Sequence, residues 1–137
     1  KFCIVPQKEG KIRVEDDLSD LWDCRSKKIT LLDNNILALP EHFEFIYLQA
    51  IKQNIKIDFN QGVDIRLIND TNARLLSEIR SNDRVRTAWD TMDMEKIFLK
   101  KIKILTKYIK PGNINVYILV GFDTEFGQDY YRVQKCK

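Results

Sequence analysis

The chain has 137 residues, of which 44% are hydrophobic and 31% are charged. This length predicts one domain, and folding of such a chain buries roughly 70% of its unfolded surface, enough for a real core. The net charge is +3, from 23 basic and 20 acidic residues, so no polyanionic partner is demanded. No apolar run approaches the roughly 20 residues of a membrane span, and the first residues do not resemble a signal peptide.

The cysteines and the single histidine exclude several kinds of site. Cys3, Cys24 and Cys136 are odd in number and far apart, which is not typical of a disulfide framework. We therefore expect a reducing compartment, the cytoplasm. One histidine, His42, and no clustered cysteines exclude an ordinary zinc site, and no Ser–His or Cys–His catalytic pair can be argued. Because the chain starts without Met and turns apolar at once, we expect a piece of a longer protein.

Strand-like and helix-like segments alternate along the chain. Acidic residues open a predicted helix over about 14–24, since carboxylates suit a helix N-terminus. A helix starts at Pro40 and runs to about Asn54, and a third is capped by Asp70 or Thr71. Apolar spacing predicts a long fourth helix over about 94–109 and another from Asp129. The predicted strands cover residues 29–32, 55–59, 85–89 and 114–120.

The strands recur at a regular interval. Their centres, near Thr30, Ile57, Arg86 and Tyr117, are separated by 27, 29 and 31 residues. A period near thirty with a helix in each interval predicts an α/β fold of repeated βα units and a parallel sheet. Right-handed crossovers would curl such a series into part of a TIM-like (β/α)6 barrel. An open doubly wound sheet is the alternative, although no Gly-rich phosphate fingerprint follows any strand.

Polar side chains follow each predicted strand. Because the carboxyl ends of parallel strands share an edge, we expect these residues to lie on one face. An Asp or Asn there suits a ligand ammonium, and Arg66 or a helix N-terminus suits a carboxylate. The alternative is that they only form turns and caps, and that Arg66 pairs with Asp64 or Asp90. The residues are Asp33, Asn34, Asn35, Asn60, Gln61, Asp64, Arg66, Asp90, Asp123 and Glu125.

The predicted fourth helix is rich in lysine. A solvated outer face explains such a pattern, and a contact with RNA or an acidic partner is the other interpretation. Aromatic residues that would support base stacking are not interleaved. The lysines are Lys96, Lys100, Lys101, Lys103, Lys107 and Lys110.

Several segments together resemble radical S-adenosylmethionine (radical SAM) enzymes. The start, KFCIVP, is similar to the end of the family's C-x3-C-x-Φ-C loop, with Phe2 as the aromatic residue and Cys3 as the last cysteine. The segments KITLLDNNILALP, IDFNQGVDIRL, RVRTAWD and VYILVGFD resemble the second to fifth βα units of its partial (β/α)6 barrel. The resemblance implies that residues 1–137 are a partial radical SAM core domain, lacking the first strand, the first two cluster cysteines and the last strand.

The resemblance also implies cofactors and partners. Cys3 would be one of three thiolates on a [4Fe–4S] cluster, whose fourth iron is bound by the amine and carboxylate of SAM. Reductive cleavage of SAM would give a 5′-deoxyadenosyl radical that attacks an unknown substrate. A flavodoxin or ferredoxin would supply the electron, and the resemblance implies no membrane partner. A nucleic acid is permitted but not indicated.

The resemblance assigns the polar strand ends to SAM. Asp33, Asn34 and Asn35 stand where the family often has a Gly-Gly-Glu that meets the SAM amine. The third-strand and fourth-strand regions would meet its amine, carboxylate or ribose, and the segment 116–125 would lie near adenine. The residues in those two regions are Asn60, Gln61, Asp64, Arg66 and Asp90.

The departures from the family pattern limit what this chain does alone. Asp-Asn-Asn replaces Gly-Gly-Glu, and Tyr117 replaces the first glycine of the usual fifth-strand pattern. One cysteine cannot hold a four-iron cluster, so we expect this chain to be inactive and its parent protein to be the enzyme. Two alternatives stay open. One is a non-catalytic βα domain that binds RNA or a protein through the helix 94–110, and the other is an iron-free enzyme with a divalent ion at Asp33, Asp64 and Asp90.

Overall fold

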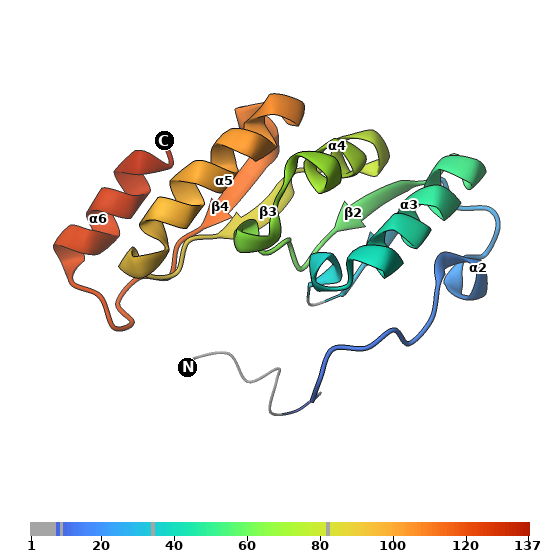
Figure 1. Cartoon of the computed structure of the whole chain (residues 1–137), viewed down its shortest axis with the longest axis horizontal. Helices are drawn as coiled ribbons and strands as arrows, with labels where there is room; N and C mark the ends of the chain where they lie inside the picture. The colour runs from blue at the N-terminus through green and yellow to red at the C-terminus, as the bar shows by residue number, and fades with distance from the viewer. Residues whose placement is uncertain (1–7, 9, 34, 82) are drawn as a thin grey trace.

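The computed structural model describes residues 8, 10–33, 35–81 and 83–137 (Figure 1). Cys3 and Asn34, two of the expected site residues, lie outside the described residues. The helices are α2 (Leu18–Leu21), α3 (Pro40–Gln53), α4 (Asp70–Ile79), α5 (Glu95–Tyr108) and α6 (Phe126–Lys135). The strands are β1 (Lys28–Leu31), β2 (Lys56–Phe59), β3 (Val85–Ala88) and β4 (Ile114–Tyr117). Short 3-10 turns are η1 (Ile36–Ala38), η2 (Ile65–Leu67), η3 (Met92–Met94) and η4 (Pro111–Asn113).

The four strands lie where the thirty-residue period predicts them. β1 pairs in parallel with β2, with Ile29 opposite Ile57, and β3 pairs in parallel with β4, with Thr87 opposite Val116. The fold is therefore α/β with parallel strands joined through helices, as expected. The described residues form two parallel pairs and no closed barrel, so the TIM-like barrel stays a prediction.

Isolated hydrogen bonds, rather than a ladder, join the two strand pairs. The Ser81 N–H, just before β3, donates to the Ile57 carbonyl of β2 at 2.7 Å, and in the loop after β2 the Val63 N–H donates to the Arg86 carbonyl of β3 at 2.8 Å. The buried Thr87 hydroxyl donates back to the Val63 carbonyl at 2.9 Å. These bonds satisfy backbone groups that a continuous sheet would have paired strand to strand.

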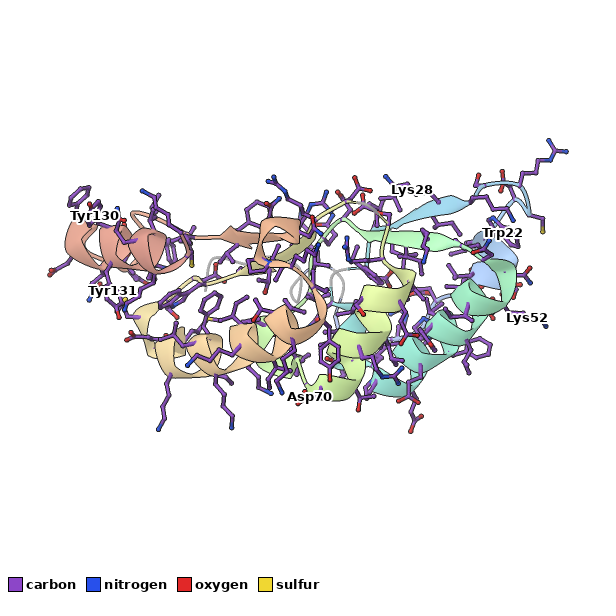
Figure 2. All side chains as sticks on the ribbon, turned by 90° about the horizontal axis from the view of Figure 1, so that it is seen from above. Trp22, Lys28, Lys52, Asp70, Tyr130 and Tyr131 are labelled. Carbon is purple, nitrogen blue, oxygen red and sulfur yellow. The ribbon has the colours of Figure 1, made fainter. Side chains whose placement is uncertain are left out.

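Helices α3, α4 and α5 cover one side of the strands, and Figure 2 shows the strands along the opposite side of the molecule. Each helix turns an apolar stripe inward, with spacings of three and four residues. The core between the layers is formed by fully or nearly fully buried side chains, among them Phe43, Ile46, Ile57, Leu76, Ile79, Trp89, Phe98 and Leu105. The other side of the strands is left without a covering helix among α3, α4 and α5.

The helix ends follow local capping chemistry. Pro40 stands in the first turn of α3, and Asn54 ends it in the left-handed conformation with a φ of +54°. The expected cap of α4 at Asp70 or Thr71 is wrong. Asn69 caps the helix, because its side chain accepts from the Asn72 N–H at 2.9 Å and the Asn72 side chain accepts from the Asn69 N–H at 2.9 Å.

Three predicted boundaries are wrong, the first two of them for reasons outside the local pattern. The helix predicted over 14–24 is only the single turn of α2. Val14 is 51% exposed, and a short helix whose apolar side chains are not buried against the core is not stable. β4 ends at Tyr117 rather than Val120, since the Leu119 carbonyl accepts a hydrogen bond from Arg132 instead of from a strand. The last helix starts at Phe126, where Glu125 and Gln128 form a reciprocal cap.

Within the part of the chain that the structure describes, every helix is too short or too polar to cross a membrane.

Candidate functional site

The uncovered side of the strands is polar. Side chains alternate along each strand, so that Ile29, Leu31, Ile57 and Phe59 pack against the helices while their neighbours face the other way. In registered pairs, Thr30 stands opposite Asp58 and Arg86 opposite Asn115. The polar residues of this open face are Lys28, Thr30, Lys56, Asp58, Arg86, Asn115 and Tyr117.

An ion pair crosses the gap between the two strand pairs on this open face. Arg86 Nη1 donates to Asp58 Oδ1 at 2.6 Å, and the two side chains are only 19% and 10% exposed. The hydrogen bond to Asp58 raises the pKa of Arg86, and Tyr117 contributes in the same direction. Sequence reasoning missed this pair, although an acid in KIDF and a base in VRTA are unusual inside apolar strands and were a usable signal.

Three of the predicted site residues form a first group beyond β2 and β3. Arg66 pairs with Asp64 as a fork, with Nε at 2.9 Å from Oδ1 and Nη2 at 2.6 Å from Oδ2. This is one of the ion pairs expected as the structural role of Arg66. Asp90 lies within electrostatic range of both side chains.

The carboxylates of this first group differ in their proton affinity. Burial acts to raise the pKa of Asp64, but the hydrogen bonds from the Arg66 guanidinium and backbone N–H outweigh it, and the pKa is lowered. The Asp90 carboxylate has no such bidentate ion pair among the described residues. Burial raises its pKa, and the charges of Arg132 and Arg66 offset this only in part. An ionised Asp90 is therefore a carboxylate that a cationic ligand would stabilise.

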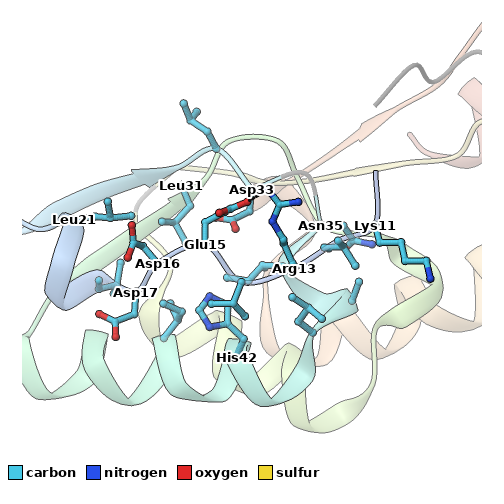
Figure 3. Close-up of a pocket in the computed structure, with 18 of the residues that line it drawn as sticks. Lys11, Arg13, Glu15, Asp16, Asp17, Leu21, Leu31, Asp33, Asn35 and His42 are labelled. Carbon is cyan, nitrogen blue, oxygen red and sulfur yellow. Dashed lines mark ion pairs between the residues drawn. The ribbon is translucent and has the colours of Figure 1, made fainter. Parts of the chain in front are cut away.

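Asp33 and Asn35 form a second group at the end of β1, in a pocket of about 600 Å³ (Figure 3). The segment 10–18 forms one wall, and His42 lines the pocket from α3. Asp33 is exposed, whereas Asn35 is half-buried and its Oδ1 atom is buried without a hydrogen-bond partner among the described residues. No hydrogen bond or ion pair between described residues joins this group to the first one.

Asn60 and Gln61 form the exposed turn that follows β2. The Asn60 N–H donates to the Leu31 carbonyl at 3.2 Å, so this turn lies beside the end of β1 and near the second group. Gly62 follows with a φ of +85°, and a Cβ atom there would lie 2.8 Å from the Arg86 carbonyl oxygen. Glycine is needed because the loop turns in the left-handed region while touching the β3 backbone.

A buried arginine on α6 joins the ends of β3 and β4, and sequence reasoning missed it. Arg132 is 0% exposed and donates to the Trp89 carbonyl at 2.7 Å, the Leu119 carbonyl at 2.7 Å and Asp129 Oδ1 at 2.6 Å. It also donates to the Asp90 carbonyl. Only Asp129 is a local partner, three residues before Arg132 on α6, and the carbonyls that Arg132 joins come from two distant segments. It holds the backbone of Asp90 in place.

The described residues do not fit an iron–sulfur cluster. No group of three His, Cys, Asp or Glu side chains among them could hold a metal ion, which also applies to the divalent site weighed at Asp33, Asp64 and Asp90. Cys24 is exposed, Cys136 is half-buried at the end of α6, and both are free thiols. Burial raises the pKa of Cys136, which disfavours the thiolate that a cluster ligand needs. No reaction step can be built on a cluster within these residues.

Comparison with known proteins finds curated relatives with one function. The chain is 26% identical to the tRNA-2-methylthio-N(6)-dimethylallyladenosine synthase of Sulfurihydrogenibium sp. (strain YO3AOP1), over 98% of this chain and 36% of that protein. The synthases of the same name from Aquifex aeolicus (strain VF5) and Hydrogenobaculum sp. (strain Y04AAS1) are 26% and 23% identical, each over 94% of this chain and 35% of its own length.

The chain spans about a third of the length of these relatives. No family model matches the chain. No solved structure matches it either.

Proposed function

We propose that this chain is the SAM-binding core of a radical SAM enzyme that acts on tRNA. The observation that carries the proposal is that similarity to the tRNA methylthio synthases extends over 94–98% of the chain. The parallel βα units and the polar side chains at the strand ends support it, because ligands of such folds bind at the carboxyl ends of the strands.

Asp90 and Asp33 are the carboxylates that we assign to the cationic groups of SAM. Asp90 is half-buried, and its raised pKa reflects a negative charge that its surroundings do not fully compensate. An ammonium or sulfonium group would supply that compensation. Asp33 lines the pocket at the end of β1 beside the unpartnered Asn35 oxygen, which can accept from an ammonium.

Asn60 and Gln61 are assigned to the ribose hydroxyls, since their amides donate and accept and lie beside the end of β1. The Arg66 guanidinium already forms an ion pair with the Asp64 carboxylate. In this proposal the two keep the β2–α4 loop in place, and backbone N–H groups rather than Arg66 receive the SAM carboxylate.

The iron–sulfur part of the proposal rests on the family resemblance and on residues outside those described. Cys3 would be one cluster thiolate, the other two would come from a longer protein, and a flavodoxin or ferredoxin would deliver the electron. The proposal keeps the cytoplasm as the location and leaves the chain inactive without these parts.

The whole protein, reconstituted anaerobically with iron and sulfide and then reduced, tests this proposal. We expect it to convert SAM to 5′-deoxyadenosine and to lose this activity when Cys3 is replaced by Ala. Asp90→Asn should raise the KM for SAM about tenfold or more, as expected for a lost charge-assisted hydrogen bond. Asp20→Asn, an exposed carboxylate on α2, is the matched control and should change nothing. A protein that carries its cluster but forms no 5′-deoxyadenosine would refute the proposal.

A further inference from the structure

The outer side of α5 carries a stripe of four lysines, Lys96, Lys100, Lys103 and Lys107, all of them exposed. Successive members are four, three and four residues apart, which on an α-helix places them within about 60° of one another around the axis. The stripe is about 16 Å long at the helical rise. In Figure 2 side chains with terminal nitrogen extend from α5 on the side away from the strands.

Little negative charge balances this stripe. After Glu95 the helix contains no acidic residue, and the Glu95 carboxylate accepts from the Tyr131 hydroxyl. Lys107 pairs with Asp70 on α4 at 2.8 Å. Lys96, Lys100 and Lys103 form no ion pair among the described residues. By contrast, Lys101 lies off the stripe and has a structural partner, since its amine donates to the Ile68 carbonyl at 2.6 Å.

The stripe works against the stability of its own helix. Lysines three and four residues apart repel one another, and Lys96 stands in the first turn, where the helix dipole disfavours a positive charge. Glutamate at alternate positions would remove this repulsion and keep the surface solvated. A partner that places negative charges along the helix would remove it as well.

The position of the stripe relates it to the proposed site. α5 follows β3, so its first turn begins at the edge where Asp90 lies, and the stripe runs from that edge along the outside of the molecule. A strand of phosphates passing the strand ends would continue along the lysines. Exposed single point charges at regular spacing suit phosphates, which bind lysine without directional demands.

We propose that the Lys96–Lys107 stripe binds the phosphate backbone of the RNA substrate. The proposal rests on the proposed function, from which the RNA is inferred to be a tRNA. Such contacts position a nucleic acid without reading its sequence, so the stripe would orient the tRNA while the strand ends meet the reacting nucleoside.

The test uses the 137-residue chain and a fluorescently labelled tRNA transcript, with binding followed by anisotropy between about 50 and 200 mM salt. The variant Lys96→Gln/Lys100→Gln/Lys103→Gln keeps good helix formers in α5 and retains the Lys107–Asp70 pair. Its affinity for tRNA should fall at least tenfold at low salt. The slope of log K against log salt should decrease by about 2–3, as for the loss of three phosphate contacts.

The matched control is Lys27→Gln/Lys52→Gln/Lys137→Gln, which removes three exposed lysines elsewhere and lowers the net charge from +3 to zero, as the stripe variant does. Lys52 lies at the end of the molecule far from α6 in Figure 2. This control should retain most of the affinity and the slope. Equal losses in both variants, or no tRNA binding by the unchanged chain at low salt, would overturn the proposal.

Two further measurements separate the proposal from its alternatives. If polyglutamate displaces the tRNA as well as an RNA duplex does, the stripe suits an acidic protein, and the proposal fails. In the whole protein, 5′-deoxyadenosine formed without RNA should be unchanged by the stripe variant. The SAM-binding proposal and the stripe proposal can therefore fail independently.

Discussion

The Arg132 guanidinium donates a 2.7 Å hydrogen bond to the backbone carbonyl of Trp89, although 43 residues separate them in the chain. The same guanidinium reaches Leu119 and Asp129, so one buried side chain on α6 joins the ends of β3 and β4. Trp89 is itself fixed from two sides, because its ring stacks on Phe98 with 4.6 Å between the ring centroids and its backbone N–H donates to the Tyr117 carbonyl at 2.8 Å.

Replacing Arg132 with Met should lower the free energy of unfolding by about 3–5 kcal/mol, because it leaves several backbone carbonyls without their donor and the buried Asp129 carboxylate without its cation. Urea unfolding followed by circular dichroism measures this loss. The control is Arg74→Met, which breaks the exposed Arg74–Glu78 pair of α4 and should cost less than about 1 kcal/mol. A loss below about 1 kcal/mol in the Arg132 variant would show that the guanidinium is not a structural link.

Gly62→Ala should destabilise the chain by about 1–3 kcal/mol, since it combines a left-handed backbone with a Cβ atom only 2.8 Å from the Arg86 oxygen. Thermal melting reports the change. Gly112→Ala is the matched control, because its Cβ atom would meet nothing within 4 Å and its φ is ordinary. That variant should be neutral or gain up to about 1 kcal/mol. Equal melting temperatures for the two variants would contradict the close approach of the loop to β3.

Asp90→Asn should stabilise the folded chain at neutral pH. The folded-state pKa of Asp90 is raised by burial above the ordinary 3.8, so its ionised form destabilises the native state. The advantage of the Asn variant should shrink as the pH falls through the folded-state pKa. It should vanish below 3.8, where the carboxyl is protonated in both folded and unfolded chains. Urea titrations at neutral and acidic pH measure it.

The exposed Asp20→Asn variant is the control for this pH series and should stay within about 0.5 kcal/mol of the parent. A destabilised Asp90→Asn chain at neutral pH would mean that the carboxylate has a structural partner. Stabilisation together with weaker SAM binding by the whole protein is the pattern expected of a ligand-binding group.

The Asp58–Arg86 pair should show a larger coupling energy than an exposed pair. A double-mutant cycle with Asp58→Ala and Arg86→Ala should yield about 1–3 kcal/mol, because both side chains are largely removed from water. The same cycle on Arg74 and Glu78 should yield about 0.3–0.5 kcal/mol. Equal coupling energies for the two pairs would mean that water screens the Asp58–Arg86 pair as strongly as it screens the exposed Arg74–Glu78 pair.

The order and type of the main elements could be predicted because they depend on local patterns. The apolar run of KITLL and the stripe of α5 each specify an element by their own periodicity, and the regular interval between strands predicts parallel pairing. The Arg66–Asp64 ion pair could also be predicted, since the two residues are only two positions apart in the sequence.

The candidate site was predicted only as a set of positions. That Asp33, Asn60, Asp64 and Asp90 follow strands is visible in the printed sequence. Their division into a pocket group and a group around Arg66 depends on the loop at Gly62 and on the gap between β2 and β3. Whether these residues hold SAM stays a prediction.

Local patterns predict the parallel βα units and most of their boundaries to within a few residues, because each element buries its own apolar side and caps its own ends. Packing of the whole chain sets the length of α2, the end of β4, the Asp58–Arg86 pair and the Arg132 contacts with Trp89 and Leu119. Those features depend on burial and on hydrogen bonds between segments distant in the chain. Such interactions leave no local pattern, because each residue acquires its partner only when the strands and helices pack together.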